Sequence, residues 1–272
     1  MRDVAGMLVV SWNVNSLKVR AEYVSMFLDA VQPDVLGLQE LKLEEAAVPI
    51  ELFESRGYHV AICAQKQWNG VLLASKTPLD NVVTGLSPAD QGQARLVAAS
   101  TRGVRFINLY CPQGQSVDSE KFPYKLGFYD ALIDWLPGDS DLSASVVVMG
   151  DLNIAPEARD IYDPAKFAGV PSFHPEEHTR WRRLEDLGFS DTMVEYLPPG
   201  TFSFWDYRGG AFRFNKGMRI DHIMATVPIA NKAQEAWVER DWRKVKPVKR
   251  DDGTIEKLKP SDHAPVAVRF DL

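Results

Sequence analysis

The stretch that decides the fold reads Val146-Val147-Val148-Met149-Gly150-Asp151-Leu152-Asn153-Ile154-Ala155-Pro156. Its first four residues form a short apolar run, which is typical of a fully buried strand. Gly150 and Pro156 interrupt regular structure, so Asp151 and Asn153 fall at the end of that strand. Because side chains two residues apart on extended backbone point the same way, we expect these two to face one spot. A carboxylate there can take a proton from water, and an amide can orient the water or an oxyanion.

Outward from this strand, short apolar or alternating runs are mixed with a few amphipathic segments. Strands are predicted at 7–13, 35–39, 58–63, 71–75, 96–99, 104–109, 219–224 and 266–270. Helices are predicted at 21–31, 48–55, 122–136 and 176–187, and a long irregular loop is expected at 156–175. Strands outnumber helices and many are joined by tight turns. This mixture favours two packed sheets flanked by helices over a doubly wound parallel sheet.

Length and composition are those of an ordinary globular protein. The chain has 272 residues, of which 45% are hydrophobic and 25% charged, with no linker-like or low-complexity tract. We therefore expect one domain over residues 1–272. Cys63 and Cys111 are too far apart for a metal-type spacing, which favours a reducing compartment. No stretch is long and apolar enough for a signal peptide or a membrane span, so a cytoplasmic protein without a membrane partner is expected.

The charge is unevenly distributed along the chain. The net charge of −6 argues against indiscriminate coating of nucleic acid. Residues 240–259 nevertheless carry eight basic and four acidic residues, so this segment is +4 within a chain that is otherwise −10. Asp251-Asp252-Gly253 within it is a good turn signal, and we interpret the segment as a charged hairpin. A solvated loop is the simpler explanation, and a phosphate-binding edge is the functional one.

Polar residues recur at the predicted strand ends: Asn13, Glu40, Asn69, Tyr110, Asp151, Asn153, Asp221, Asp262 and His263. Taken singly, each is more often structural: Glu40 a surface acid, His263 a satisfied histidine, Asp221 a surface partner of Arg219 or Lys216. Their joint recurrence favours one site instead. Carboxylate and amide oxygens suit hard cations, so we expect Mg²⁺, with Mn²⁺ able to substitute. A hard cation with carboxylates and a histidine indicates phosphoryl transfer to water.

An ordered set of motifs then carries a specific resemblance. The motifs are Trp12-Asn13-Val14-Asn15, Leu38-Gln39-Glu40-Leu41-Lys42, Asn69-Gly70-Val71, Asn108-Leu109-Tyr110-Cys111-Pro112-Gln113-Gly114, Gly150-Asp151-Leu152-Asn153, Arg219-Ile220-Asp221-His222 and Ser261-Asp262-His263-Ala264-Pro265. In this order they resemble the exonuclease III family of apurinic/apyrimidinic endonucleases, within the endonuclease/exonuclease/phosphatase superfamily. The match spans essentially the whole chain. It implies an α/β fold of α+β type, a four-layer αββα sandwich.

The resemblance also implies a role for each site residue. Asp151 activates the attacking water with help from Asn153, Asp221 holds His263 as a phosphate ligand, and Tyr110 supplies a phosphate-side hydroxyl. The implied metal ligands are Glu40 first, then Asn13, Asp151, Asn153, Asp262 and His263. The implied substrate contacts are Asn69, Gln113, Lys121, Phe204, Trp205 and Arg208. Of these, Phe204 and Trp205 are expected to wall a pocket for an extruded baseless sugar.

The implied function is hydrolysis of the phosphodiester 5′ of abasic sites in duplex DNA, with 3′-to-5′ exonuclease and 3′-end-cleaning activity. The implied partner is double-stranded DNA with abasic or blocked 3′ ends, bound by a monomer. Two alternatives stay open. One is a superfamily phosphodiesterase on another phosphate ester, such as an inositol phosphate or sphingomyelin. The other is a catalytically silent, nucleic-acid-binding relative, although such a protein loses the carboxylates that this chain retains.

Overall fold

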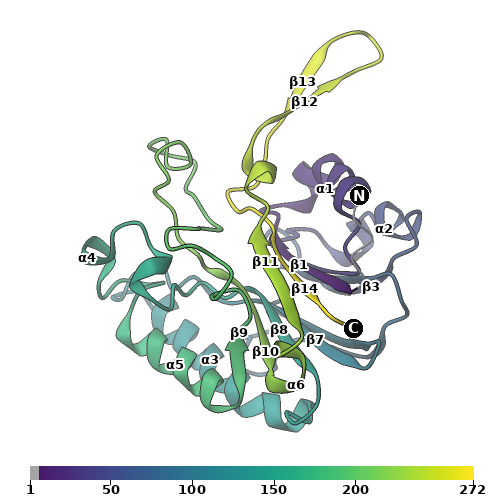
Figure 1. The fold of residues 1–272 in the computed structure, drawn as a ribbon. Helices are drawn as coiled ribbons and strands as arrows, with labels where there is room; N and C mark the ends of the chain where they lie inside the picture. The colour runs from purple at the N-terminus through teal and green to yellow at the C-terminus, as the bar shows by residue number, and fades with distance from the viewer. Residues whose placement is uncertain (1–5) are drawn as a thin grey trace.

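The computed structural model describes residues 6–272, and its layers run helix, sheet, sheet, helix (Figure 1). The first six-stranded sheet has the order β11-β14-β1-β2-β4-β3, with β1 Met7–Asn13, β2 Val35–Gln39, β3 His59–Cys63, β4 Val71–Ser75, β11 Ala233–Val238 and β14 Val266–Phe270. The second has the order β5-β6-β7-β8-β10-β9, with β5 Asp80–Thr84, β6 Leu96–Thr101, β7 Val104–Tyr110, β8 Val146–Asp151, β9 Phe189–Asp191 and β10 Asp221–Thr226. The predicted four-layer sandwich is confirmed.

Helices cover the outer face of each sheet (Figure 1). On the first sheet these are α1 Leu17–Val31 and α2 Glu51–Glu54; on the second they are α3 Lys121–Asp139 and α5 Pro175–Asp186. The short α6 Val227–Ala230 follows β10. No helix in the described residues is long and apolar enough to cross a membrane.

Period-two alternation along the central strands divides the core into three apolar layers. In β8, Val147 and Met149 pack between the sheets, whereas Val146 and Val148 pack under α3 and α5. In β1, Val9 lies between the sheets and its neighbours pack under α1. Because side chains alternate along a strand, Asn13, Asp151 and Asp221 continue the face that lies between the sheets. The open end of the gap between the sheets is thus lined by polar groups.

Several local expectations need correction. The 156–175 segment is not wholly irregular, since it holds a 3₁₀ turn at Ala158–Asp160 and the helix α4 Pro164–Phe167. The turn is fixed by a capping box, and α4 begins with a proline after Asp163, whose side chain accepts from the Lys166 amide. The edge strands β5, β9 and β11 were not predicted, because short and partly exposed strands carry little periodic signal.

Candidate active site

Strand direction brings the predicted residues to one edge of the molecule. The parallel pairs β1–β2 and β7–β8 end together, so Asn13 lies beside Gln39, and Tyr110 beside Asp151. β10 runs antiparallel to β8 and begins there, with Asp221 opposite Asp151. The segment that carries His263 precedes β14, which starts beside β1. Two sheets therefore contribute to a single site.

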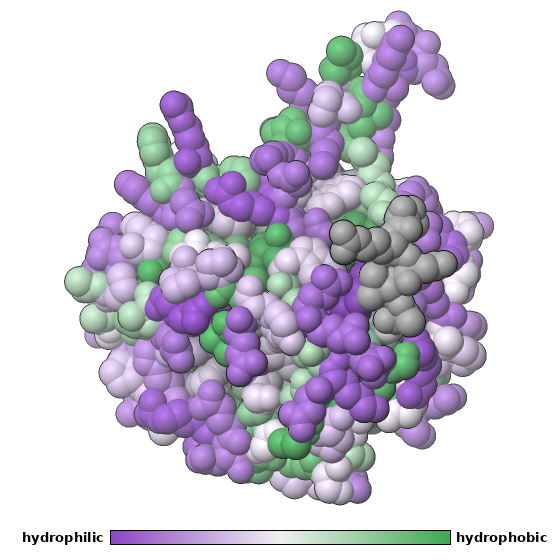
Figure 2. Space-filling model, viewed as in Figure 1, coloured by the Kyte–Doolittle hydropathy of each residue, from purple (hydrophilic) through white to green (hydrophobic). Residues whose placement is uncertain are grey.

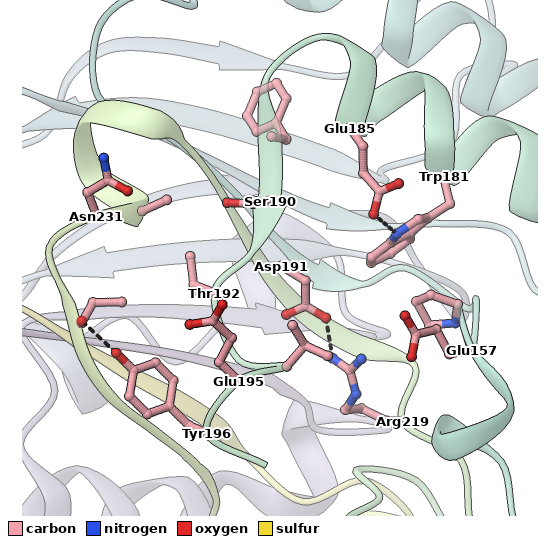
Figure 3. Close-up of a pocket in the computed structure, with 15 residues that line it drawn as sticks. Glu157, Trp181, Glu185, Ser190, Asp191, Thr192, Glu195, Tyr196, Arg219 and Asn231 are labelled. Carbon is pink, nitrogen blue, oxygen red and sulfur yellow. Dashed lines mark hydrogen bonds and ion pairs between the residues drawn. The ribbon is translucent and has the colours of Figure 1, made fainter. Parts of the chain in front are cut away.

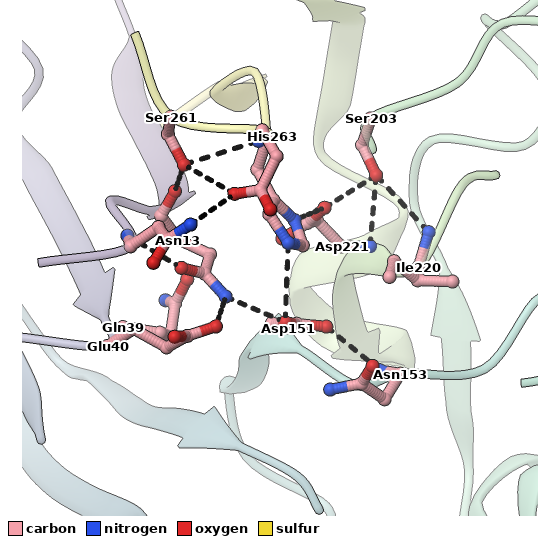
Figure 4. Close-up of polar contacts among 12 residues, drawn as sticks. Asn13, Gln39, Glu40, Asp151, Asn153, Ser203, Ile220, Asp221, Ser261 and His263 are labelled. Atoms are coloured by element: carbon pink, nitrogen blue, oxygen red, sulfur yellow. Dashed lines mark hydrogen bonds and ion pairs between the residues drawn. The ribbon is translucent and has the colours of Figure 1, made fainter. Parts of the chain in front are cut away.

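Asn13 joins the two sheets directly (Figure 4). Its Nδ2 donates to Glu40 Oε1 at 2.7 Å and to Asp151 Oδ2 at 2.8 Å. Its Oδ1 accepts from the backbone amide of Asn15 at 2.9 Å, so both ends of the buried amide are satisfied. One side chain thus sets the separation of the two carboxylates.

Glu40 is placed by the turn that follows β2. Its φ of 56° lies in the left-handed region, which is uncommon for a residue other than glycine and is frequent at functional sites. Its Oε2 lies 2.7 Å from the Lys42 ammonium. Burial opposes ionisation, but the charge of Lys42 and the hydrogen bonds from Lys42 and Asn13 lower the Glu40 pKa below its usual value. The carboxylate is therefore ionised.

Asp151 is positioned by a glycine that no other residue can replace. Gly150 has a φ of 145°, and a Cβ built on it would lie 2.0 Å from the Leu109 carbonyl oxygen. Asn153 follows with a φ of 52°, so the chain has already left the extended conformation there and the expected strand geometry does not extend this far. Asp151 and Asn153 nevertheless line one pocket. Burial, opposed by the charge of His263, raises the Asp151 pKa to about 7.

His263 is held by a buried chain of hydrogen bonds (Figure 4). Its Nδ1 lies 2.8 Å from Asp221 Oδ2, and the Ser203 hydroxyl donates to the same oxygen at 2.6 Å. Its Nε2 lies 3.8 Å from Asp151 Oδ2. Burial alone would lower the His263 pKa, but the Asp221 and Asp151 charges raise it to about 10. The imidazole is therefore protonated at neutral pH. The suggestion that Asp221 pairs with Arg219 on the surface is wrong, because Asp221 is fully buried.

These groups form the floor of a pocket of about 320 Å³. Its walls include Phe204, whose ring packs on the His263 imidazole with centroids 4.9 Å apart. The lining residues are Glu40, Tyr110, Gln113, Gln115, Asp151, Asn153, Phe167, Val170, Pro171, Ser172, Phe204, Met218, Ile220, Asp262 and His263. The pocket thus has an ionic floor and one apolar wall. Burial and the charges of Glu40 and Asp151 raise the Tyr110 pKa well above its ordinary value, so the phenol keeps its proton.

A second pocket of about 570 Å³ adjoins the first through Tyr110, Gln113 and Gln115, which line both. It contains the predicted substrate contacts Asn69 and Lys121. Its remaining lining is amide, cationic or aromatic, namely Gln65, Trp68, Gln93, Arg95, Pro112, Gly114 and Tyr124. No carboxylate from residues 6–272 lines it, although acids outnumber bases in the chain as a whole. Such a surface suits a polyanion next to the ionic site.

Two predicted substrate contacts do not reach either pocket. Trp205 is fully buried with Phe202, Ala211 and Ala264, and its indole nitrogen donates to Asn215 Oδ1 at 3.1 Å. It lies on the opposite side of its segment from Phe204, which is the reason that only one of the adjacent rings meets the pocket. Arg208 is an exposed side chain paired with Asp206 at 2.6 Å. Trp205 is therefore a core residue and not a substrate contact, whereas a contact between Arg208 and the substrate stays a prediction.

Sequence reasoning missed several supporting residues. Ser203 orients Asp221, and no sequence pattern indicated it. Lys125 is fully buried and donates to the Asn153 carbonyl at 2.7 Å, while its ammonium lies 2.5 Å from Glu177. This lysine had a detectable signal, because it stands on the apolar stripe of the predicted 122–136 helix, where a charge needs a partner.

A third pocket, of about 440 Å³, is lined by residues of α5 and β9 and of the segments that follow β9 and α6 (Figure 3). At its base Arg219 donates to Asp160 at 2.7 Å and to Asp191 at 2.5 Å. Its rim carries Glu157, Glu185 and Glu195. The acidic rim disfavours phosphate, and the buried arginine ties the start of β10 to its neighbours. We therefore assign this network to support of Asp221.

The residues present fit a hard cation. Ligand atoms of Glu40, Asp151 and His263 lie within 4.8 Å of one another, the one such group of three or more acidic, histidine or cysteine side chains in residues 6–272. A protonated His263 cannot bind a cation, which leaves the oxygens of Glu40 and Asp151, with Asp262 in the same pocket. Oxygen-only ligands are what Mg²⁺ and Mn²⁺ prefer.

A four-layer sandwich whose two sheets bring carboxylates, an asparagine and a carboxylate-held histidine to one edge defines a class of protein. The family described as the Endonuclease/Exonuclease/phosphatase family matches residues 10–263, and the chain belongs to this family. A curated relative, exodeoxyribonuclease III of Haemophilus influenzae, is 35% identical over 279 aligned positions, covering 97% of this chain and all of the relative. The resemblance to the exonuclease III family is confirmed.

Solved structures of DNA-processing enzymes also resemble this chain. A 3′ phosphatase from Neisseria bound to a product DNA hairpin is 36% identical, with a TM-score of 0.88, over 98% of this chain and all of that one. An AP endonuclease from Archaeoglobus fulgidus is 33% identical, with a TM-score of 0.88 and the same coverage. The chain is thus homologous to nucleases that act on DNA.

Proposed function

We propose that the protein hydrolyses the phosphodiester 5′ of abasic sites in duplex DNA and also removes nucleotides and blocking groups from 3′ ends. The observation that carries this proposal is the 3.8 Å distance between His263 Nε2 and Asp151 Oδ2 in the first pocket. This pocket adjoins the second pocket, which is called the carboxylate-free groove from here on. Because the Asp151 carboxylate and the protonated His263 imidazole lie this close together, both can act on the same phosphate. Homology to an exodeoxyribonuclease III and to an AP endonuclease supports the choice of DNA.

Asp151 and His263 have different roles in proton transfer. Asp151, with a pKa of about 7, takes a proton from the attacking water, because a base is most effective when its pKa lies near the working pH. His263 stays protonated and donates from Nε2 to a non-bridging phosphate oxygen, since Asp221 holds its Nδ1–H. Tyr110 keeps its phenolic proton and donates to the phosphate from the opposite wall. These donors are in place before reaction.

The cation that we propose is Mg²⁺, with Mn²⁺ as a substitute, which Glu40 and Asp262 would hold while Asp151 keeps an oxygen free for the attacking water. When bound, it supplies positive charge that polarises the phosphate and stabilises the charge on the leaving oxygen. The Asn13 amide holds Glu40 and Asp151 at a fixed separation, so the ligand oxygens are arranged by the fold rather than by the ion.

We assign the discrimination between abasic and intact nucleotides to the apolar wall of the first pocket. Phe204 and Met218 form this wall beside His263, and Val170 and Pro171 continue it from the loop before α5. An extruded sugar without a base fits against apolar side chains, whereas an intact nucleotide brings a base that must be accommodated. The carboxylate-free groove then receives the flanking duplex.

That the protein acts as a monomer in the cytoplasm stays a prediction.

The alternatives are weaker. A catalytically silent relative would lack the ionic groups, yet Glu40, Asp151, Asp262 and His263 all line one pocket. A lipid or inositol phosphodiesterase does not require a groove lined by amides, cations and exposed Trp68.

The direct test is cleavage of a duplex that contains one abasic site, with and without Mg²⁺, together with release of phosphate from a 3′-phosphorylated duplex. We expect Asp151→Asn to lower both rates by about 10²–10⁴-fold, the usual contribution of a general base. DNA affinity should be retained or increased, since a negative charge is removed. Asp186→Asn, an exposed acid at the end of α5, is the matched control. Asp151→Asn within threefold of wild type would remove Asp151 from the mechanism.

A further inference from the structure

The segment from 244 to 259, called here the basic arm, stands away from the body of the protein. Its strands β12 Lys246–Lys249 and β13 Ile255–Leu258 pair only with each other. The arm rises from the end of the molecule at which β1 and β2 finish (Figure 1), and the space-filling view shows it projecting as a largely hydrophilic finger (Figure 2). Its second strand leads into Ser261, Asp262 and His263. The arm is thus attached directly to the site.

The base of the arm is held firmly. The Tyr23 hydroxyl donates to the Lys244 carbonyl on one side, and the Tyr207 hydroxyl donates to the Pro260 carbonyl at 3.0 Å on the other. Between them Trp242 packs edge-on against Tyr23, with ring centroids 5.6 Å apart. Arg20 also donates to the Pro260 carbonyl, at 3.3 Å. One end of the arm is therefore fixed to the buried Tyr23, and the other to Arg20 and the half-exposed Tyr207.

The arm has one face that contacts the body. Lys246 is paired with Leu258, and Val248 with Glu256, so these four share a face. The Lys246 ammonium lies 4.5 Å from the centre of the Trp242 ring, and Leu258 packs on the apolar cluster under α1. Arg250 continues this face and binds both carboxylate oxygens of Glu22 in α1, at 2.8 and 2.7 Å. This face holds the arm against α1.

The other face is exposed and basic. It carries the register pairs Pro247 with Lys257 and Lys249 with Ile255, all of them exposed. Ile255 has 67% of its surface exposed, although it is large and apolar. Neither Lys249 nor Lys257 forms an ion pair with any residue between 6 and 272. The hairpin thus presents two lysines without ion pairs next to an uncovered apolar side chain, Lys249 across from Ile255 and Lys257 two positions along the same strand.

We propose that this face binds the sugar–phosphate backbone of duplex DNA, away from the scissile bond. Lys249 and Lys257 contact phosphates, and Ile255 packs against a deoxyribose between them. The charge distribution supports this partner, because the residues outside 240–259 have a net charge of −10, whereas the arm carries the exposed Lys249 and Lys257. The inference rests on the proposed DNA substrate and adds a contact that cleavage at the pocket does not require.

The length of the arm sets where the contact falls. Lys257 and Asp262 are five positions apart, and five steps of extended chain span at most about 16 Å at roughly 3.3 Å each. Phosphates on one strand advance about 3.4 Å each along the duplex axis. The arm should therefore meet the backbone about five nucleotides from the scissile phosphate, on one side only.

The test uses Lys249→Gln with Lys257→Gln, both in an Asp151→Asn background so that bound DNA is not cut. Affinity for a 30-base-pair duplex with one abasic-site analogue is measured against NaCl concentration. We expect affinity to fall about tenfold at low salt and the slope of log K against log salt to decrease by about two. The matched control is Arg102→Gln with Lys232→Gln, which removes the same charge at the opposite end of the sheets and should change neither quantity.

The second measurement is the affinity for duplexes shortened on one side of the lesion or the other. Trimming the duplex to about four base pairs on one side of the lesion should abolish the difference between the arm variant and its parent, and trimming the other side should preserve it. An unchanged salt slope, or a difference that survives both trimmings, would overturn the proposal. Both side chains are exposed, so folding is not at stake, and Lys249→Glu with Lys257→Glu should double the effect. Failure of the DNA function itself is separate, because wild-type protein would then not cut the duplex at all.

Discussion

Glu40 adopts an unfavourable backbone conformation that places its carboxylate in the site. A left-handed conformation in a residue other than glycine typically costs about 1–3 kcal/mol and persists only when the surroundings determine it. Here the surroundings are the Asn13 amide and the Lys42 ammonium, which hold the two carboxylate oxygens. The position of this carboxylate is thus set by its neighbours and not by its own backbone preference.

Replacement of Glu40 by alanine should raise the Mg²⁺ concentration needed for half-maximal cleavage by at least tenfold, because a hard-cation ligand is lost while the phosphate donors remain. The measurement is the cleavage rate of an abasic duplex across a Mg²⁺ titration, with DNA affinity followed in parallel. Glu44→Ala, an exposed glutamate paired with Lys66, serves as the control. An unchanged midpoint would show that Glu40 is not a ligand of the cation.

Asp221→Asn should change the pH dependence of cleavage more than its maximum. Asp221 supplies the largest of the charges that raise the His263 pKa to about 10, so its removal lowers that pKa. His263 then loses its proton at lower pH, and the alkaline limb of the kcat/KM profile should move down by more than one pH unit. Profiles from pH 5.5 to 10.5 in constant metal test this. An alkaline limb that does not move means that protonated His263 is not the active form.

Phe204 and Trp205 are adjacent but should respond differently to truncation. Phe204→Ala should reduce discrimination between abasic and intact duplex by about tenfold, the lower range for loss of an apolar pocket contact. Release of a 3′ phosphate, which needs no extruded sugar, should change less. Trp205→Ala should leave discrimination unchanged while costing about 3–5 kcal/mol of stability, because its ring is buried. Equal losses on both substrates for Phe204→Ala would place substrate selection in the 156–175 segment.

Among the elements, those with strong periodicity were predicted and those without it were missed. The run that ends at Asp151 predicted its strand because buried residues there are apolar on both faces. By contrast β5 is mostly exposed, so its sequence carries no alternation to detect. Trp205 was misplaced for a different reason: it is buried with Phe202, Ala211 and Ala264, and the aromatic run alone did not show which of the two adjacent rings meets the pocket.

The packing of α3 on α5 depends on a buried ion pair that supports the site. Lys125→Met should destabilise the protein by about 3–5 kcal/mol, because the Glu177 carboxylate is left buried without its partner. Adding Glu177→Gln should recover part of that loss, since a neutral amide keeps a hydrogen bond from the Ser172 amide. Urea unfolding measures both. If the double variant is no more stable than Lys125→Met alone, the unpaired charge is not the cause.

At the scale of the whole molecule, the site exists only where the sheets meet. The motif order and the strand ends predicted which residues gather, because parallel strands finish at a common edge. Their contacts across the gap could not be predicted. Asn13 and Asp151 are 138 positions apart, and nothing local fixes the 2.8 Å bond between them. Gln39 and Asn108 form a second buried link between the sheets, at 2.6 Å, that sequence alone did not indicate.

The place of β14 has a consequence for the order in which the protein can form. This strand lies between β1 and β11, so the first sheet closes only when residues from 233 onward join those before 76. The second sheet is drawn from a continuous stretch between 80 and 226 and can pair earlier during synthesis. His263 and the closing strand then arrive together. A ribosome-bound chain that has not yet exposed them has Glu40, Asp151 and Asp221 but neither Asp262 nor His263, so its site stays incomplete until the closing strand is in place.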